Sequence, residues 1–360
     1  MECCVVLSGS VRRDCEPRSA CPLSTWLHIT RNTTLRHAHL YTGMHLQRGS
    51  GLPAVKVVEV VDIARAAGRV IMDVYKTSPE TWESRSKSDD TPVTKADVMA
   101  DELIRSRLLS AYPDIPIISE EGEQLPYEER RDYECCWVVD PLDGTKEFIK
   151  RTGDFAVMIG LSLHGKSVLG VVHAPAQPTP QTYYAVAKKG AFVLPGGEDQ
   201  CGEGLEGSDR ISARSFGVKD PGLRLAVSSS RPPQTFIDAC NEPVTCSIGS
   251  AALKALAVAD GTADVFPCFY STSEWDTCAP QIIVEEAGGV VLPFSGSGEG
   301  GMAEVEALLL SRDAEGTSPS SSSVGGDVRV SYNKADLSSP PCLFLGCCST
   351  HKVVKDGEQR

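Results

Sequence analysis

Two aspartates three residues apart, at the end of an apolar run, are the residues of this sequence best suited to chemistry. The segment 137–148 reads WVVDPLDGTKEF and places Asp140 and Asp143 beside a Gly-Thr turn. Pro141 fixes its own φ and removes a donor, and Gly144 allows close backbone approach, so we expect the strand to stop with both acids at its tip. Two carboxylates, a carbonyl between them and a nearby hydroxyl are oxygen ligands of the kind that Mg²⁺ prefers.

Two further acids lie where predicted elements end or begin. Ile115–Ile118 is a short apolar run, predicted to be a strand, and Glu120 follows it closely. If this strand and the run before Asp140 share a sheet, both carboxylates lie at the edge where α/β proteins usually bind ligands. Asp276 lies at the start of a helix predicted over 274–286, where N-capping alone would explain an aspartate, although a cap also fixes the direction of a metal-binding carboxylate.

Gathered at one edge, these four carboxylates would repel one another unless cations were bound. Two or more Mg²⁺ ions would resolve the repulsion, clamp a phosphate and lower the pKa of an attacking water. Phosphatases of the haloacid dehalogenase type also contain Asp-Gly-Thr, but they need a second Asp two positions after the nucleophile. The interval between Asp140 and Asp143 is three, which favours phosphate ester hydrolysis by a metal-activated water over an aspartyl-phosphate intermediate.

Hydrophobic spacing indicates the elements that position these acids. It predicts an amphipathic helix from Ala54 to Tyr75 and a second helix that opens near Pro92. Asp97 lies in the first turn of the second helix, where interaction with the helix dipole would be enough to explain it. Alternating residues predict two hairpins, 155–164 with 167–173 and 182–187 with 191–194. Further runs predict strands at 223–227, 263–266 and 290–293 and a helix at 233–240.

Small residues from Ser247 to Ala252 predict a helix start whose backbone N–H groups face an anion. Lys254, further along this helix, could add a positive charge. Close packing would explain the small residues as well, so the meaning of this segment depends on the acidic edge.

Composition limits the class of protein. The 360 residues, 41% of them hydrophobic, can bury a full core, and no run reaches the roughly 20 apolar residues that a membrane helix needs. The net charge of −13 argues against a nucleic-acid-binding surface, which relies on clustered Lys and Arg. Fourteen cysteines without a C-x-x-C motif indicate reduced thiols. We expect a soluble monomer or homodimer that binds neither nucleic acid nor membrane.

Three segments fall outside the predicted fold. Residues 1–52 are rich in Arg and Ser and poor in acids, as in an organelle transit peptide; a disordered extension or a mispredicted start explains this equally well. The expected location is the cytoplasm, or a plastid or mitochondrion if the extension is a transit peptide. Residues 295–327 are a low-complexity insertion, and residues 350–360 are a polar tail.

Three motifs together resemble the signatures of the lithium-sensitive, Mg²⁺-dependent inositol monophosphatase superfamily. They are Ser119-Glu120-Glu121, Asp140-Pro141-Leu142-Asp143-Gly144-Thr145 and Trp275-Asp276-Thr277-Cys278-Ala279-Pro280. Within this superfamily, Lys146-Glu147-Phe148, Ser247-Ile248-Gly249-Ser250 and Tyr332-Asn333-Lys334-Ala335-Asp336-Leu337 resemble the 3′(2′),5′-bisphosphate nucleotidase branch, which acts in sulfur assimilation. The resemblance covers about residues 54–346.

The resemblance implies an α/β fold, a five-layer αβαβα sandwich, with an α+β subdomain over 53–210 that holds the metal site and an α/β subdomain over 211–349. It implies two to three Mg²⁺ ions, bound by Glu120, Asp140, the Leu142 carbonyl, Asp143 and Asp276. It also makes Asp97 the support of Thr145, which orients the attacking water. The substrate contacts implied are the Gly144 and Thr145 amides at the phosphate and Ser247, Gly249 and Lys254 at the nucleotide.

The implied reaction is hydrolysis of 3′-phosphoadenosine 5′-phosphate to AMP and phosphate. An inositol (poly)phosphate 1-phosphatase of the same fold is the first alternative, and a non-catalytic sensor of phosphorylated nucleotides is a remote one. The segment Ser228–Pro233 departs from the branch's usual Ser-Arg-Ser-His pattern, so Arg231 is left out of the expected site.

Overall fold

The computed structural model describes residues 45–46, 54–87, 92–196, 204–216, 222–240, 244–294 and 330–348. The expected insertion at 295–327 and the tail at 350–360 lie outside the described residues, as does most of 1–52. The exception is β1 (His45–Leu46), which pairs antiparallel with β2 (Val55–Lys56), so this part of the expected extension belongs to the fold. All described residues fall within one compact unit, Thr42–Arg360.

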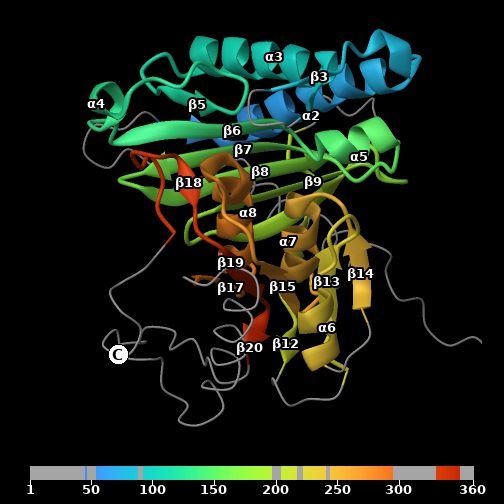
Figure 1. Ribbon diagram of the computed structural model, residues 1–360. Helices are drawn as coiled ribbons and strands as arrows, with labels where there is room; N and C mark the ends of the chain where they lie inside the picture. Colours follow the sequence, from blue (N-terminus) through green and yellow to red (C-terminus); the bar gives the residue numbers. More distant parts are fainter. Residues whose placement is uncertain are drawn as a thin grey trace, which may run out of the picture. The chain divides into compact units, whose positions relative to one another are not determined.

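Helices and sheets alternate in five layers within this unit (Figure 1). Helices α2 (Val57–Tyr75) and α3 (Lys95–Ala111) form one outer layer, against a seven-stranded sheet. Helices α7 (Ala251–Ala259) and α8 (Glu274–Glu286) fill the space between that sheet and a five-stranded sheet, and α6 (Gln234–Cys240) covers the far side. The predicted αβαβα sandwich is confirmed. None of the helices in the described residues is long and apolar enough to cross a membrane.

The seven-stranded sheet is antiparallel except at one edge. Its strands in spatial order are β11 (Asp209–Ile211), β10 (Gly190–Pro195), β9 (Gln181–Val186), β8 (Lys166–Ala174), β7 (Ala156–Leu163), β6 (Cys135–Asp143) and β5 (Ile117–Ser119). Both predicted hairpins are present, as β7–β8 and β9–β10. Strands β5 and β6 are parallel, so their carboxyl ends meet at the same edge, as predicted from the acids that follow them.

The five-stranded sheet separates two apolar cores. Its strands in spatial order are β14 (Val244–Ile248), β13 (Leu225–Ser228), β15 (Val265–Cys268), β19 (Cys342–Leu345) and β17 (Val290–Pro293). Successive side chains of a strand point to opposite faces. Leu225 and Val227 therefore pack with Phe236 of α6, while Ala226 joins the larger core around α7 and α8.

Short elements connect these layers. They are a 3₁₀ turn (Pro79–Thr81), β3 (Arg85–Ser86), β4 (Pro92–Val93), α4 (Tyr127–Arg130), α5 (Thr145–Lys150), β12 (Ser215–Phe216), β16 (Thr272–Ser273), β18 (Ser338–Ser339) and β20 (Cys347–Cys348). The sequence analysis predicted neither α4 nor α5.

Strand β6 does not stop at Pro141 but continues to Asp143. Its pairing with β7 shifts register between Asp140 and Asp143, so Pro141, which has no N–H to donate, falls in an irregular stretch. The chain leaves the sheet at Gly144, whose φ of 97° suits glycine, and α5 begins at Thr145.

Two glycines let α8 lie directly on the seven-stranded sheet. Gly160 of β7 and Gly170 of β8 are paired across the strands. A Cβ at Gly170 would overlap the carbonyl oxygen of Ala279 and lie 2.7 Å from Cγ2 of Ile282. A Cβ at Gly160 would lie 2.6 Å from Sγ of Cys278. The absence of side chains here sets the depth of α8, which carries Asp276.

We predict that Gly170→Ala destabilises the fold by about 1–3 kcal/mol, because the new methyl group meets helix backbone that cannot move aside. Chemical denaturation of the full chain measures this. Gly122→Ala is the control, since the nearest atom to a Cβ there lies at 3.4 Å, and we expect a change below about 0.5 kcal/mol. Equal stability of the two variants would show that α8 does not depend on this close contact.

Candidate metal centre

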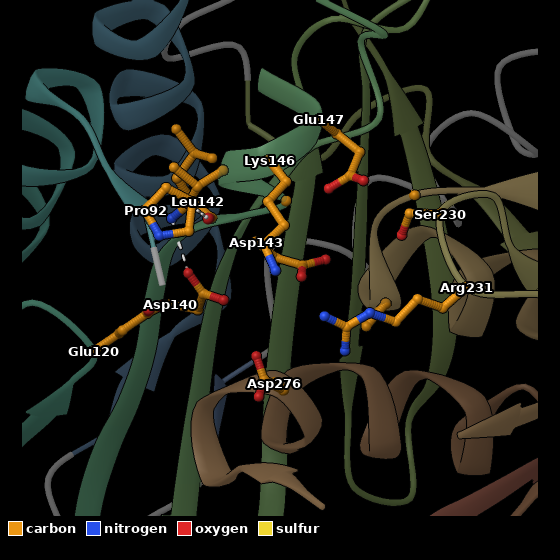
Figure 2. Close-up of a pocket in the computed structure, with 14 residues that line it drawn as sticks. Pro92, Glu120, Asp140, Leu142, Asp143, Lys146, Glu147, Ser230, Arg231 and Asp276 are labelled. Atoms are coloured by element: carbon orange, nitrogen blue, oxygen red, sulfur yellow. Dashed lines mark hydrogen bonds between the residues drawn. The ribbon is translucent and has the colours of Figure 1, made fainter. Parts of the chain in front are cut away.

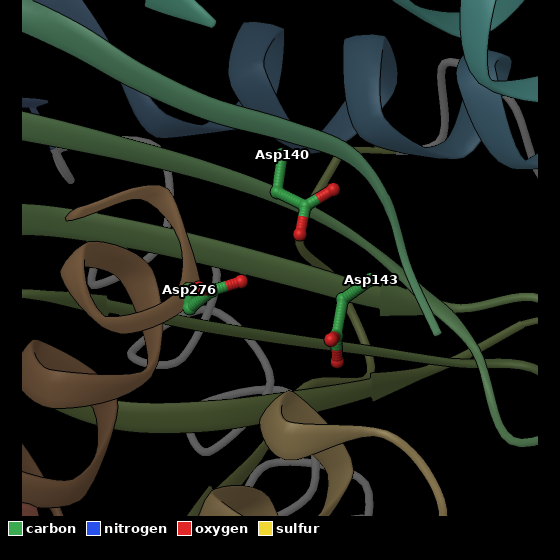
Figure 3. Close-up of side chains that lie close together, drawn as sticks. All are labelled: Asp140, Asp143 and Asp276. Carbon is green, nitrogen blue, oxygen red and sulfur yellow. The ribbon is translucent and has the colours of Figure 1, made fainter. Parts of the chain in front are cut away.

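Three aspartates converge at the edge of the sheet where β6 ends (Figure 3). They are Asp140 and Asp143 at the end of β6 and Asp276 in the first turn of α8. Each offers a carboxylate oxygen, and these oxygens lie within 4.8 Å of one another. Burial, reinforced by the neighbouring carboxylates, raises the pKa of Asp140 well above its usual value and that of Asp276 to about 8. A divalent cation bound here would displace these protons and relieve the repulsion.

Hydrogen bonds from backbone N–H groups orient each of these carboxylates. The N–H of Leu142 donates to Asp140 Oδ1 at 2.9 Å (Figure 2), and the N–H of Ser273 donates to Asp276 Oδ2 at 2.7 Å as part of a capping box. Such bonds fix the orientation of each carboxylate, and one oxygen of each lies within 4.8 Å of the others.

Asp143 is held by the start of α7. Its Oδ2 accepts hydrogen bonds from the Ser250 hydroxyl and, at 2.9 Å, from the N–H of Ala252. The small-residue helix start therefore does face an anion, as predicted from the sequence, but that anion is a carboxylate of the protein itself. Ser250 was missed as part of the site because its partner lies 107 positions away in sequence.

Helix α3 supports both strand ends that carry acids. Asp97 forms a capping box with Thr94, and its Oδ1 accepts a hydrogen bond from the Thr145 hydroxyl at 2.9 Å. One turn later, Asp101 accepts a hydrogen bond at 2.5 Å from Ser119, the residue before Glu120. Burial raises the pKa of the Asp97 carboxyl. The structure thus brings Asp97 and Thr145 together, and the dipole interaction alone does not account for Asp97.

Glu120 lies on the same pocket but outside the group of three aspartates. Lys87 bridges it to Glu121, with its ammonium nitrogen 2.7 Å from Glu120 and 2.6 Å from Glu121. Burial opposes the charge on Lys87, but the two carboxylates raise its pKa above the usual value. The sequence analysis missed Lys87, which stands in a polar stretch without a motif.

The three aspartates and Glu120 line a pocket of about 320 Å³, and Glu147 lines it as well (Figure 2). Leu142, Gly144 and Thr145 line it as well, and Lys146 lies beside them. Arg231, which the sequence analysis left out, reaches into the pocket from the segment after β13. The pocket therefore combines a cluster of acids with two cationic side chains, an arrangement suited to metal ions and an anionic ligand together.

The expected nucleotide contacts divide into two groups. Gly249 lines the pocket, whereas Ser247 and Lys254 do not. Ser247 is exposed on β14, and Lys254 is buried behind the turn, where its ammonium donates to the carbonyls of Ile248 at 3.2 Å and Gly249 at 2.9 Å. In this arrangement Lys254 supports the turn that presents Gly249, and its contact with a nucleotide stays a prediction.

Known proteins are similar to this chain in sequence and in fold. The profile of the inositol monophosphatase family matches residues 55–323. The 3′(2′),5′-bisphosphate nucleotidase CysQ of Aggregatibacter actinomycetemcomitans is 35% identical over 240 residues, which cover 66% of this chain and 84% of that protein. The protein of the same name from Salmonella typhimurium is 39% identical over 239 residues, covering 66% and 90%.

Solved structures agree. The crystal structure of CysQ from Bacteroides thetaiotaomicron, a bacterial member of the inositol monophosphatase family, superposes with a TM-score of 0.59 and 30% identity, over 80% of this chain and 96% of that one. The family profile spans most of the chain, and the relatives exceed 30% identity over most of their own length. The chain belongs to the inositol monophosphatase family.

Proposed function

We propose that this protein is a Mg²⁺-dependent phosphatase that hydrolyses 3′-phosphoadenosine 5′-phosphate to AMP and phosphate. The observation that carries the proposal is the group of three aspartates in a pocket that also holds Arg231 and Lys146. The names of the relatives, 3′(2′),5′-bisphosphate nucleotidases, support the substrate.

The donor set fits Mg²⁺. All the candidate ligands are oxygen atoms: the carboxylates of the three aspartates and of Glu120, and the Leu142 carbonyl, all on the pocket wall. Bound Mg²⁺ supplies positive charge beside the ester phosphate and lowers the pKa of a coordinated water. We propose two to three ions, because one divalent cation would not balance the negative charge of four carboxylates.

Thr145 orients the attacking water. Its hydroxyl lies 2.9 Å from Asp97 Oδ1 and 3.3 Å from the Leu142 carbonyl, either of which can accept its proton. Its oxygen, on the pocket wall, can then accept a hydrogen bond from a water. That bond turns a lone pair of the water toward the phosphorus atom. The amides of Gly144 and Thr145, where β6 gives way to α5, bind oxygens of the phosphate to be removed.

Arg231 recognises the phosphate that the substrate keeps. A nucleotide with two phosphates needs a cation away from the metal ions, and Arg231 enters the pocket from the C-terminal half of the chain, opposite Glu120 (Figure 2). An inositol monophosphate would leave this guanidinium without a phosphate partner. An inositol monophosphatase is therefore the weaker alternative, whereas an inositol bisphosphate would also keep a phosphate for Arg231 and is distinguished by its relative turnover. A sensor without activity would not need the complete set of candidate ligands.

The partners and the location that we propose for this protein are inferred from its sequence. A net charge of −13 supports a protein that handles small phosphates through metal ions rather than nucleic acid. We propose a monomer or homodimer, located in the cytoplasm, or in a plastid or mitochondrion if residues 1–52 act as a transit peptide.

We predict faster phosphate release from 3′-phosphoadenosine 5′-phosphate than from inositol 1-phosphate or inositol 1,4-bisphosphate, with Mg²⁺ present, and inhibition by Li⁺. Arg231→Met should raise KM for the nucleotide roughly 10- to 100-fold, the value of one charge-assisted contact, and change KM for inositol 1-phosphate little. Steady-state phosphate assays measure both. Equal or faster turnover of the inositol phosphates by the wild-type protein would refute the proposed substrate.

We predict that Asp143→Asn lowers kcat more than roughly 100-fold. Loss of a residue that only hydrogen-bonds to a metal ligand typically costs 10- to 100-fold, and Asp143 is proposed to be a ligand itself. Circular dichroism should show an unchanged fold, since the asparagine oxygen can still accept from Ser250 and Ala252. Asp238→Asn, an exposed acid on α6, is the control for loss of one negative charge and should keep full activity. Substantial activity in Asp143→Asn would mean that the metal site is misassigned.

A further inference from the structure

The first turn of α8, which carries Asp276, is held by a segment near the other end of the described chain. Glu274 lies in this turn with none of its surface exposed. Its carboxylate accepts hydrogen bonds from the N–H of Asn333, from the N–H of Lys334 at 2.8 Å and from the Lys334 ammonium at 2.7 Å. The Glu274 N–H in turn donates to the carbonyl of Leu337 at 2.9 Å.

The same segment is fastened to the connection between β5 and β6. Arg130, buried on α4, donates to the side-chain oxygen of Asn333 at 2.9 Å and to the carbonyls of Lys334 at 2.6 Å and Ala335 at 2.8 Å. The Asn333 amide donates back to the Arg130 carbonyl at 2.7 Å. This connection begins at Glu120, so the segment ties the Glu120 side of the metal centre to α8.

A carboxylate removed from water resists displacement. Three donors converge on Glu274, and any movement of the first turn of α8 would leave a buried charge with fewer partners. Asp276 is two residues further along the same turn, and its own oxygen is held by the Ser273 N–H. The location of Asp276 relative to β6 is therefore coupled to the bonds that Glu274 makes.

We propose that Glu274 is a positioning residue for the metal centre: through Asn333, Lys334 and Arg130, it holds Asp276 at the distance from Asp140 and Asp143 that metal binding requires. This inference rests on the proposed metal site. It assigns a task to the segment Tyr332–Leu337, whose resemblance to the nucleotidase branch had no structural explanation from the sequence alone.

The far end of α8 provides a matched comparison. Glu286, the last residue of the helix, accepts hydrogen bonds from the N–H groups of Lys188 at 2.6 Å and Gly190 at 2.7 Å in the turn between β9 and β10. It fastens the same helix through two backbone N–H donors, away from the acids, although it is only partly buried. Loss of the hydrogen bonds to either glutamate should weaken the fold, but only loss of those to Glu274 should weaken metal binding.

The test compares Glu274→Gln with Glu286→Gln in the full chain, by thermal unfolding in EDTA and across a Mg²⁺ titration without substrate. Glutamine replaces one acceptor oxygen by an NH₂ group that faces the donors of Asn333 and Lys334. We expect the Mg²⁺ concentration that raises Tm by a fixed increment above the EDTA value to increase about tenfold or more in Glu274→Gln, and to stay within about twofold of wild type in Glu286→Gln. Lys334→Met, which keeps the backbone donors, should give a smaller increase in the same direction.

If Glu274→Gln needed no more Mg²⁺ than wild type for the same increment in Tm, the inference would be overturned. Equal increases in the two glutamine variants would overturn it as well, because they would show a general loosening of α8. If Glu274→Gln does not fold, the comparison of Lys334→Met with Glu286→Gln decides by the same criteria. A wild-type protein whose Tm does not respond to Mg²⁺ would refute the proposed metal site itself, a result distinct from a response that the variants leave unchanged.

Discussion

The mutual repulsion of three clustered carboxylates, at least partly buried, is the constraint on which the rest of this structure depends. Asp140, Asp143 and Asp276 come from two distant parts of the chain, and in the folded protein their oxygens lie within 4.8 Å of one another. Burial makes this arrangement costly, as the raised pKa values show. The protein counters the repulsion with backbone N–H groups at each carboxylate, and the Mg²⁺ ions that we propose would complete the compensation.

Helices hold the acids in place against this repulsion. The start of α7 binds Asp143, the capping box of α8 aims Asp276, and α3 supports both strand ends through Asp97 and Asp101. Close contact between α8 and the paired glycines sets the depth of that helix. Stability and function are thus joined in the same contacts, because the packing that stabilises the sandwich also sets the geometry of the metal centre.

Periodicity and turn residues, which are local signals, predicted the main helices, the hairpins and the acid-bearing strand ends. The layered fold was predicted from the resemblance to the family. The sequence did not predict α5, which is short and lacks a periodic pattern, or the roles of Lys87 and Ser250, whose partners are distant in sequence. Lys254 was expected at the nucleotide; its ammonium donates to the carbonyl of Gly249, and its contact with a nucleotide stays a prediction. Arg231 was set aside on a motif mismatch, yet the chain path after β13 brings it into the pocket.

The central claim, that these acids form a multi-metal centre, is tested most directly by anomalous diffraction from crystals of the protein grown with Mn²⁺ in place of Mg²⁺. The account predicts at least two anomalous peaks, about 3.5–4 Å apart, bonded to carboxylate oxygens of Asp140, Asp143 and Asp276. A structure in which Mn²⁺ binds elsewhere and no peak lies among these three residues would contradict it.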